Sequence, residues 1–215
     1  MSEGFFLVLE GPEGAGKSTL AATLAERFRA AGHDPAIVRE PGGTPAAEAL
    51  RRVLLAHSGD LGPEQELLFM TAARADLVAS VIRPALASGR VVLSDRYDLS
   101  TVAYQGAGRG LPADKVAFVN QCATRGLRPD LTLILDIPPE LGFEHQLSSG
   151  KPRDRLDREP LDFHRRVAAR YRAEQGPGIV HLDATEPQDA LADAAWAAVL
   201  GARPALQRAA ARRPS

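Results

Sequence analysis

The chain has 215 residues, of which 45% are hydrophobic and 25% are charged, and its formal net charge at pH 7 is −1. This length favours one domain around one core, and the near-neutral charge argues against non-specific binding to nucleic acid or membranes. The single cysteine, Cys122, excludes an intramolecular disulfide. Since the sequence shows no secretory leader pattern and no apolar run of about 18 residues, we expect a cytoplasmic protein.

Strand and helix patterns alternate along the chain. Short apolar runs predict buried strands at residues 5–10, 36–39, 91–94, 131–137 and 179–182. Helical patterns lie at residues 17–31, 45–57, 63–88, 112–127, from about 139 onward, 161–175 and 187–200. This alternation predicts βαβ units, and hence an α/β fold: a doubly wound, five-stranded parallel sheet with helices on both faces.

We expect residues 1–201 to form a single domain. Residues 202–215 are rich in alanine and arginine and are expected to be a flexible, solvated tail. A charged stretch at about 150–160 has little apolar periodicity and lies between two predicted helices. We expect a short mobile lid there, at about residues 145–160.

A glycine-rich loop joins the first predicted strand to the first predicted helix. Residues 11–18 read G-P-E-G-A-G-K-S and fit the motif G-x-x-x-x-G-K-[ST], which is typical of P-loop NTP hydrolase-like folds. In such a loop, backbone N–H groups surround a phosphate, and the helix that follows adds the positive end of its dipole. Lys17 is expected to reach the β- and γ-phosphates of ATP, and Ser18 to offer its hydroxyl to Mg²⁺. The candidate nucleotide-binding residues are Gly11, Pro12, Glu13, Gly14, Ala15, Gly16, Lys17, Ser18 and Thr19.

The third predicted strand is followed by Asp95 and Arg96. An arginine fork matches the oxygens of a phosphate, which suits an acceptor that itself carries a phosphate group. The carboxylate of Asp95 could orient the water ligands of a metal ion. A simple ion pair at the strand end is the alternative, so these two residues alone leave the choice between a kinase and another P-loop protein open.

The chain resembles bacterial thymidylate kinases over about residues 5–200. The matching stretches are L-E-G-P-E-G-A-G-K-S-T (9–19), R-E-P-G-G-T (39–44), L-R-x-x-L-L (50–55), A-A-R (72–74), D-R-Y-x-x-S-x-x-A-Y-Q-G (95–106), R-P-D-L-T-L-x-L-D (128–136), D-R-L-D (154–157) and D-A-T (183–185). Apart from the phosphate loop each is weak, but together, in this order and spacing, they are specific. The resemblance implies the reaction ATP + dTMP giving ADP + dTDP, in dTTP biosynthesis, with Mg²⁺ required and a homodimer as the assembly.

The resemblance also implies roles for individual residues. Glu13 corresponds to an acidic residue that approaches the sugar 3′-hydroxyl of the acceptor. Arg51 and Arg96 correspond to ligands of the acceptor phosphate, and Arg74 to the group that hydrogen-bonds thymine. An arginine at that base edge would favour thymine and uracil over cytosine.

Further candidates lie where the acceptor is expected. Arg39 and Glu40 end the second predicted strand, at the carboxyl edge where open α/β sheets bind ligands. Ser100, Tyr104 and Gln105 fall where the family lines its base and sugar pocket. For Ser100 and Tyr104, ordinary helix packing is the alternative.

Two places depart from the family pattern. Where the family often has a phenylalanine that stacks on the base, this chain has Met70, with Phe69 beside it, and either side chain could cover the base. The family's lid often has arginines before its glycine, whereas here they follow it, as Arg153, Arg155 and Arg158.

An arginine is expected at the transferring phosphoryl group, whose transition-state charge spreads over three oxygens. Residues 11–18 contain no arginine, and family members of this kind carry one in the lid. Arg155, in the D-R-L-D stretch, is the first candidate and Arg153 the second. A solvated loop whose arginines pair with neighbouring carboxylates is the alternative. The candidate catalytic residues are Glu13, Lys17, Arg96, Arg153 and Arg155, and the candidate metal ligands are Ser18 and Asp95.

Two other functions are weighed against this one. Another nucleoside-monophosphate or small-molecule kinase would share the scaffold but prefer a different acceptor. A P-loop switch would bind ATP or hydrolyse it slowly, and adding a nucleoside monophosphate would change neither the binding nor the hydrolysis.

Overall fold

The computed structural model describes residues 4–56, 61–148, 150 and 153–211. Residues 149, 151 and 152 of the expected lid, and residues 212–215 of the expected tail, lie outside this described part. Within it, no helix combines the length and the hydropathy needed to cross a membrane.

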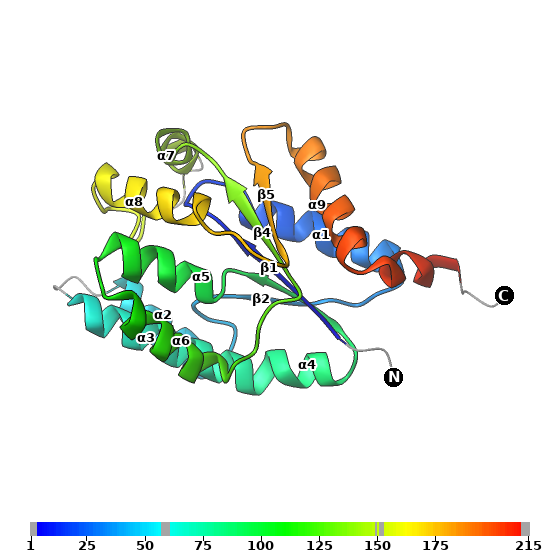
Figure 1. The fold of residues 1–215 in the computed structure, drawn as a ribbon, viewed down its shortest axis with the longest axis horizontal. Coiled ribbons are helices and arrows are strands. Elements are labelled where there is room, and N and C mark those ends of the chain that lie inside the picture. The colour runs from blue at the N-terminus through cyan, green and yellow to red at the C-terminus, as the bar shows by residue number, and fades with distance from the viewer. Residues whose placement is uncertain (1–3, 57–60, 149, 151–152, 212–215) are drawn as a thin grey trace.

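The strands of the described chain form one parallel sheet (Figure 1). They are β1 (Phe5–Glu10), β2 (Ala36–Arg39), β3 (Val91–Asp95), β4 (Leu131–Asp136) and β5 (Ile179–Asp183). Their order in the sheet is β2-β3-β1-β4-β5, and every neighbouring pair is parallel. The predicted five-stranded, doubly wound sheet is therefore confirmed. The loop after β1 leaves the central strand at the carboxyl edge, where such sheets bind ligands.

Helices connect the strands. They are α1 (Lys17–Ala30), α2 (Pro45–Ala56), α3 (Pro63–Leu77), η1 (Val78–Ile82), α4 (Arg83–Ala87), α5 (Asp98–Thr101), η2 (Val102–Gly108), α6 (Ala113–Thr124), α7 (Pro139–Ser148), α8 (Leu161–Arg172), α9 (Gln188–Ala202) and η3 (Pro204–Ala211). The turns η1 and η2 are π-helical, and η3 is a 3₁₀ helix. Helix α3, η1 and α4 run on without a break, so the single helix predicted over 63–88 is continuous but contains a π-helical turn.

Alternate side chains of β1 enter the core on opposite faces of the sheet. Leu7 and Leu9 pack in a cluster with Phe28 of α1 and with α9, whereas Phe6 packs in a second cluster with Ile82 of η1. Figure 1 shows α1 beside α9 on one side of the sheet and α4 on the other. The apolar run of β1 is thus buried on both faces, as expected of a central parallel strand.

Two segments differ from the sequence-based expectation. The glycine-rich segment after β3 forms α5 and η2, because the buried carboxylate of Glu10 accepts the N–H groups of Tyr97 (2.8 Å) and Ser100 (3.1 Å) at the start of that helix. The expected tail begins with η3, whose Leu206 is buried in the core cluster of α1 and α9. The carbonyl oxygen of Leu206 also lies 3.0 Å from a ring nitrogen of His33.

Candidate functional site

The phosphate loop lies between β1 and α1, and two of its glycines have left-handed backbone conformations. Gly14 has φ 74° and Gly16 has φ 84°, a region that residues with a Cβ rarely adopt. A Cβ on Gly14 would also meet the carbonyl oxygen of Gly142, the helical glycine of α7, at 2.0 Å. Glycine at position 14 therefore allows both the turn of the loop and the close approach of α7.

Two cavities meet over this loop. The larger, of about 750 Å³, extends from the loop to β2, α3 and residues 153–157. The smaller, of about 160 Å³, lies between the loop, α7 and the turn before α9. Both are lined by Gly14, Gly16, Thr19, His145 and Gln188. The loop can therefore face two ligands at once, one in each cavity.

Lys17 lies at the floor of the larger cavity. Its Nζ donates to the carbonyl oxygens of Gly11 (3.0 Å) and Pro12 (2.6 Å). Burial, and then the positive charge of Arg96, lower the pKa of Lys17 to about 8. A buried ammonium group held only by carbonyl oxygens is stabilised when an anion such as a phosphate comes next to it.

Ser18 and Asp95 come together as expected. Ser18 Oγ donates to Asp95 Oδ2 at 2.7 Å, and both residues line the larger cavity. A hydroxyl and a carboxylate are hard oxygen ligands of the kind that Mg²⁺ takes together with water and phosphate oxygens. No cluster of three or more histidine, cysteine or acidic side chains in the described chain could hold a metal ion. The donor set therefore fits Mg²⁺ shared with a nucleotide.

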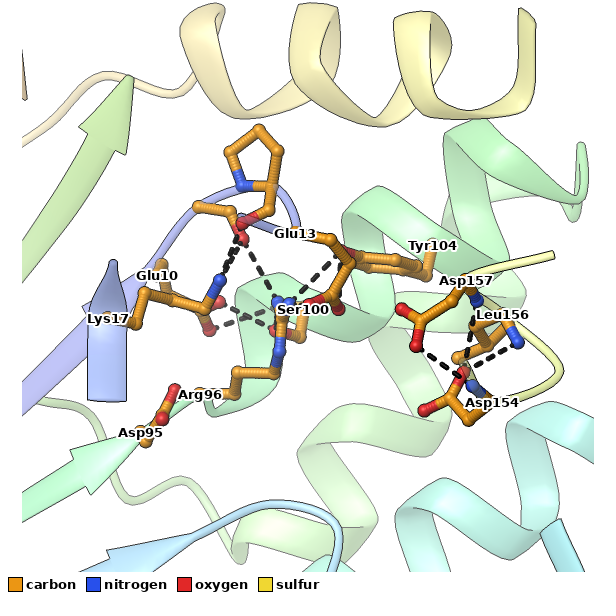
Figure 2. Close-up of polar contacts among 12 residues, drawn as sticks. Glu10, Glu13, Lys17, Asp95, Arg96, Ser100, Tyr104, Asp154, Leu156 and Asp157 are labelled. Carbon is orange, nitrogen blue, oxygen red and sulfur yellow. Dashed lines mark hydrogen bonds and ion pairs between the residues drawn. The ribbon is translucent and has the colours of Figure 1, made fainter. Parts of the chain in front are cut away.

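Arg96 occupies the centre of the site (Figure 2). It has φ 75°, an uncommon conformation for a residue with a side chain and one that often marks functional positions. Its guanidinium bonds Glu13, and it donates to the hydroxyls of Tyr104 (3.1 Å) and Ser100 (3.1 Å). Burial alone would raise the pKa of Glu13, but the charges of Arg96 and Lys17 lower this pKa to about 2. Glu13 is therefore a carboxylate at neutral pH.

Glu10 and Tyr171 support Arg96 from behind, and sequence reasoning missed both. Glu10 is fully buried and accepts hydrogen bonds from Ser100 Oγ (2.6 Å) and Tyr171 Oη (2.9 Å). Burial raises the pKa of Glu10, and Arg96 opposes this. Tyr171 also accepts a bond from Arg96 at 3.2 Å. An acidic residue closing an apolar strand could have signalled Glu10, whereas Tyr171 stands in an ordinary helical pattern.

Arg39 and Arg51 line the same cavity as Arg96. Arg39 is paired with Glu48 at 2.8 Å, and Arg51 donates to the carbonyl oxygen of Pro41 at 2.8 Å. Burial, and then the neighbouring charge of Arg39, lower the pKa of Arg51. Three guanidinium groups on one cavity suit a doubly charged phosphate, which would relieve their mutual repulsion.

Met70 and Phe69 differ in their relation to the cavity. Met70 is 5% exposed and lines it, whereas Phe69 does not. Of these two residues, Met70 is therefore the one that α3 presents to the cavity.

We expect Met70→Ala to weaken dTMP binding by about 1 kcal/mol or more, since the thymine ring would lose an apolar contact surface. Phe69→Ala is the matched control and should leave dTMP binding unchanged while lowering the melting temperature. Titration with dTMP and thermal melts of both variants check this. Weaker dTMP binding in Phe69→Ala alone would show that Phe69 covers the base.

Two predicted substrate residues do not reach the cavity. Arg74 is 1% exposed, and its guanidinium donates to Glu40 (2.7 Å), Thr101 (2.8 Å), Asn120 (2.6 Å) and the Tyr97 carbonyl oxygen (2.8 Å). Gln105 is also buried, and its amide donates to Glu66 at 2.7 Å. The guanidinium of Arg74 is occupied by partners inside the protein, whereas Gln105 Oε1 is buried without a hydrogen-bond partner in the described structure. Neither residue lines the cavity, and their contact with the acceptor stays a prediction.

Glu40 lines the cavity in front of Arg74. Arg74 bonds one of its carboxyl oxygens, whereas Oε1 is buried without a hydrogen-bond partner in the described structure. Burial outweighs the charge of Arg74 and raises the pKa of Glu40 to about 7. Arg74 thus acts on the cavity through the position and charge of Glu40.

We call residues 153–159 the covering segment. Its Asp154, Leu156 and Asp157 line the same cavity as Arg96 and are drawn with it in Figure 2. Arg153 lines the cavity, with its guanidinium carbon 4.6 Å from the ring centroid of Phe143. Arg155, the first candidate of the sequence analysis, does not line it. Arg155 instead bonds Glu66 and donates to the Leu54 carbonyl oxygen at 3.3 Å. Of the two candidate arginines, Arg153 is therefore the one placed on the cavity, and the catalytic role of either stays a prediction.

The smaller cavity is lined by residues to which the sequence analysis gave no site role. They include Ala184 and Thr185 of the D-A-T stretch, and Glu186. Thr185 donates to Asp183 Oδ1 through its N–H (2.9 Å) and its hydroxyl (2.6 Å), which fixes the turn after β5. The D-A-T stretch could have signalled this turn, because an aspartate that bonds the backbone two residues on is a common turn former.

Known proteins similar to this chain share a name. Residues 9–195 match the family described as thymidylate kinase. A protein named thymidylate kinase from Deinococcus radiodurans is 48% identical over 203 residues, which cover 93% of this chain and 98% of that protein. One from Thermomicrobium roseum is 50% identical over 198 residues, covering 91% and 94%, and one from Pseudomonas fluorescens is 50% identical over 188 residues, covering 86% and 89%. The matched region includes the phosphate loop, Arg96 and the covering segment.

Proposed function

The chain belongs to the thymidylate kinase family, and we propose that it transfers the γ-phosphoryl group of ATP to dTMP and releases ADP and dTDP. The observation that carries this proposal is the junction of two cavities over one phosphate loop. The smaller suits the nucleoside of the donor. The larger has the guanidinium groups of Arg39, Arg51 and Arg96 for the phosphate of the acceptor.

The donor is held by the loop. Its phosphates lie against the backbone N–H groups of residues 11–18 and the start of α1, where the helix dipole favours negative charge. Lys17 exchanges the carbonyl oxygens of Gly11 and Pro12 for phosphate oxygens. Ser18 and Asp95 would hold Mg²⁺, which when bound neutralises charge on the phosphates.

The acceptor is held in the larger cavity. Arg39, Arg51 and Arg96 bind its phosphate, and Glu13 keeps Arg96 in place while its carboxylate faces the sugar. Transfer is in line and needs no covalent protein intermediate, because the protein contributes position and positive charge. Arg153 brings a guanidinium group from the covering segment.

We also propose that the protein is a cytoplasmic homodimer, as the family resemblance implies. Helix α3 packs against α6, and each exposes a large apolar side chain, Leu68 and Phe118. Exposed apolar side chains on neighbouring helices are consistent with a contact between two copies.

A coupled ADP-release assay with dTMP, dUMP, dCMP, AMP and GMP tests the proposed function. We expect kcat/KM for dTMP to exceed that for dCMP by at least about a thousandfold, since a site built to bond a polar base edge rejects an analogue that leaves it unpaired. Glu40 Oε1 suits the N3–H of thymine, which cytosine lacks. Equal rates for dTMP and dCMP, or ADP release unaffected by any monophosphate, would contradict the proposal.

A further inference from the structure

A buried carboxylate on α3 joins three separate segments of the chain. Glu66 is fully buried and lies outside both cavities. It accepts hydrogen bonds from Gln105 Nε2 (2.7 Å) of η2 and from Arg109 Nη2 (2.9 Å), and it bonds Arg155 of the covering segment. Such a carboxylate is stable only while its charged partners stay in place.

The same network holds the far end of the covering segment. Arg109 pairs with Glu159 at 2.7 Å as well as with Glu66. Its guanidinium carbon lies 4.8 Å from the ring centroid of Phe163, the third residue of α8. Glu66 therefore binds the covering segment directly at Arg155 and, through Arg109, at Glu159.

The attachment at Arg155 lies within a tight turn of residues 154–157, and this turn faces the cavity. Asp154 Oδ1 accepts the N–H groups of Leu156 (2.8 Å) and Asp157 (3.0 Å), as Figure 2 shows. Asp157 Oδ2 in turn accepts the N–H group of Asp154 at 2.9 Å. Arg153 precedes this turn and bonds the carbonyl oxygen of Asp157 within it. The turn is bonded internally and keeps its shape, so the position of Arg153 depends on how Arg155 and Glu159 attach the segment.

Glu66 is also connected to residues that line the larger cavity. Met70 lies four residues further along α3, one helical turn from Glu66, and lines the cavity. Gln105 follows Tyr104, whose hydroxyl contacts Glu13 and Arg96. The buried carboxylate thus lies behind the cavity wall and beneath the covering segment.

We propose that Glu66 is a positioning residue for phosphoryl transfer. It holds the covering segment against the wall of the larger cavity, so that Arg153 faces the reacting phosphoryl group. This inference rests on the proposed function. It gives Arg155 an attachment role rather than a catalytic one. It also means that the position of Arg153 depends on the acceptor side of the site more than on the ATP side.

The test compares Glu66→Gln, Arg155→Met and the double variant with the wild type. Glu64→Gln is the matched control, since Glu64 lies on the same helix but is exposed and pairs with Lys115 at the surface. We expect kcat to fall at least about tenfold in each single variant, and the double variant to lose no more than about threefold beyond the worse single one. The Kd for ATP without acceptor should stay within about threefold of wild type, and Glu64→Gln should keep its kcat.

A second comparison separates positioning from general packing. In an Arg153→Met background, Glu66→Gln should lower kcat by less than about threefold, because the group that it positions is gone. Three outcomes would each overturn the inference. Glu66→Gln could lower kcat as much in the Arg153→Met background as in the wild type. Arg155→Met could keep the wild-type kcat, or the losses of the two single variants could multiply in the double variant. If Glu66→Gln does not fold, Arg155→Met is compared in the wild-type and Arg153→Met backgrounds instead. Its loss of kcat should then be smaller in the Arg153→Met background, and an equal loss in both would overturn the inference. A wild type that releases no ADP in response to dTMP would instead refute the proposed function and, with it, this inference.

Discussion

Replacing Lys17 with alanine should lower kcat/KM at least about a hundredfold, which corresponds to roughly 2.7 kcal/mol of transition-state stabilisation. Lys17 is the buried cation of the phosphate loop, and its Nζ donates to the carbonyl oxygens of Gly11 and Pro12. Negative charge moves on the phosphates during transfer, so a fixed ammonium group beside them stabilises the transition state more than the ground state. The assay is ADP release at saturating and limiting ATP.

Lys115→Ala is the matched control, because Lys115 is a surface lysine that pairs with Glu64 at 3.3 Å and lies far from the loop in sequence. It should keep kcat/KM within about threefold of wild type. Thermal melts of both variants show whether the loss reflects catalysis or folding. Turnover near the wild-type level in a folded Lys17→Ala protein would refute the phosphate-loop interpretation.

The sheet and the phosphate loop could be predicted because their signals are local. The apolar run of β1 is continuous since both faces of a central parallel strand are buried, and the loop motif follows directly from its glycine and lysine spacing. The sequence also named Ser18 and Asp95 as candidate metal ligands, and the structure brings them together because β1 and β3 are neighbouring parallel strands whose ends share one edge of the sheet. The helical segment α5–η2 had no such signal, since Glu10, which caps it, lies 87 residues away from Tyr97.

The direction of individual side chains could not be predicted. Arg74 and Arg155 both carry a guanidinium group in a family stretch, and nothing in the local sequence shows whether it points into the cavity or behind it. Their partners, Glu40 and Glu66, lie 34 and 89 residues away along the chain. Long-range ion pairs therefore draw these two guanidinium groups away from the cavity, and only the folded chain shows them.

Arg153→Ala should lower kcat at least about a hundredfold, with a much smaller change in the Kd for ATP measured without acceptor. The charge of the transferring phosphoryl group spreads over three oxygens in the transition state, and residues 11–18 offer it no guanidinium. Arg153 lines the larger cavity, and its Nε is buried without a hydrogen-bond partner in the described structure. A phosphoryl oxygen would supply that partner during transfer.

Arg155→Ala and Arg158→Ala separate this role from the others. Arg155 is occupied by Glu66, so its loss should lower kcat less than the loss of Arg153, and only through the attachment of the covering segment. Arg158 is exposed and should be replaceable within about threefold in kcat. A larger loss in Arg155→Ala than in Arg153→Ala would mean that Arg155 leaves Glu66 during the reaction and contacts the phosphoryl group itself. The ion pair between Arg155 and Glu66 would then have to break in every turnover. In that case, a Glu66→Gln variant would keep a kcat close to that of the wild type.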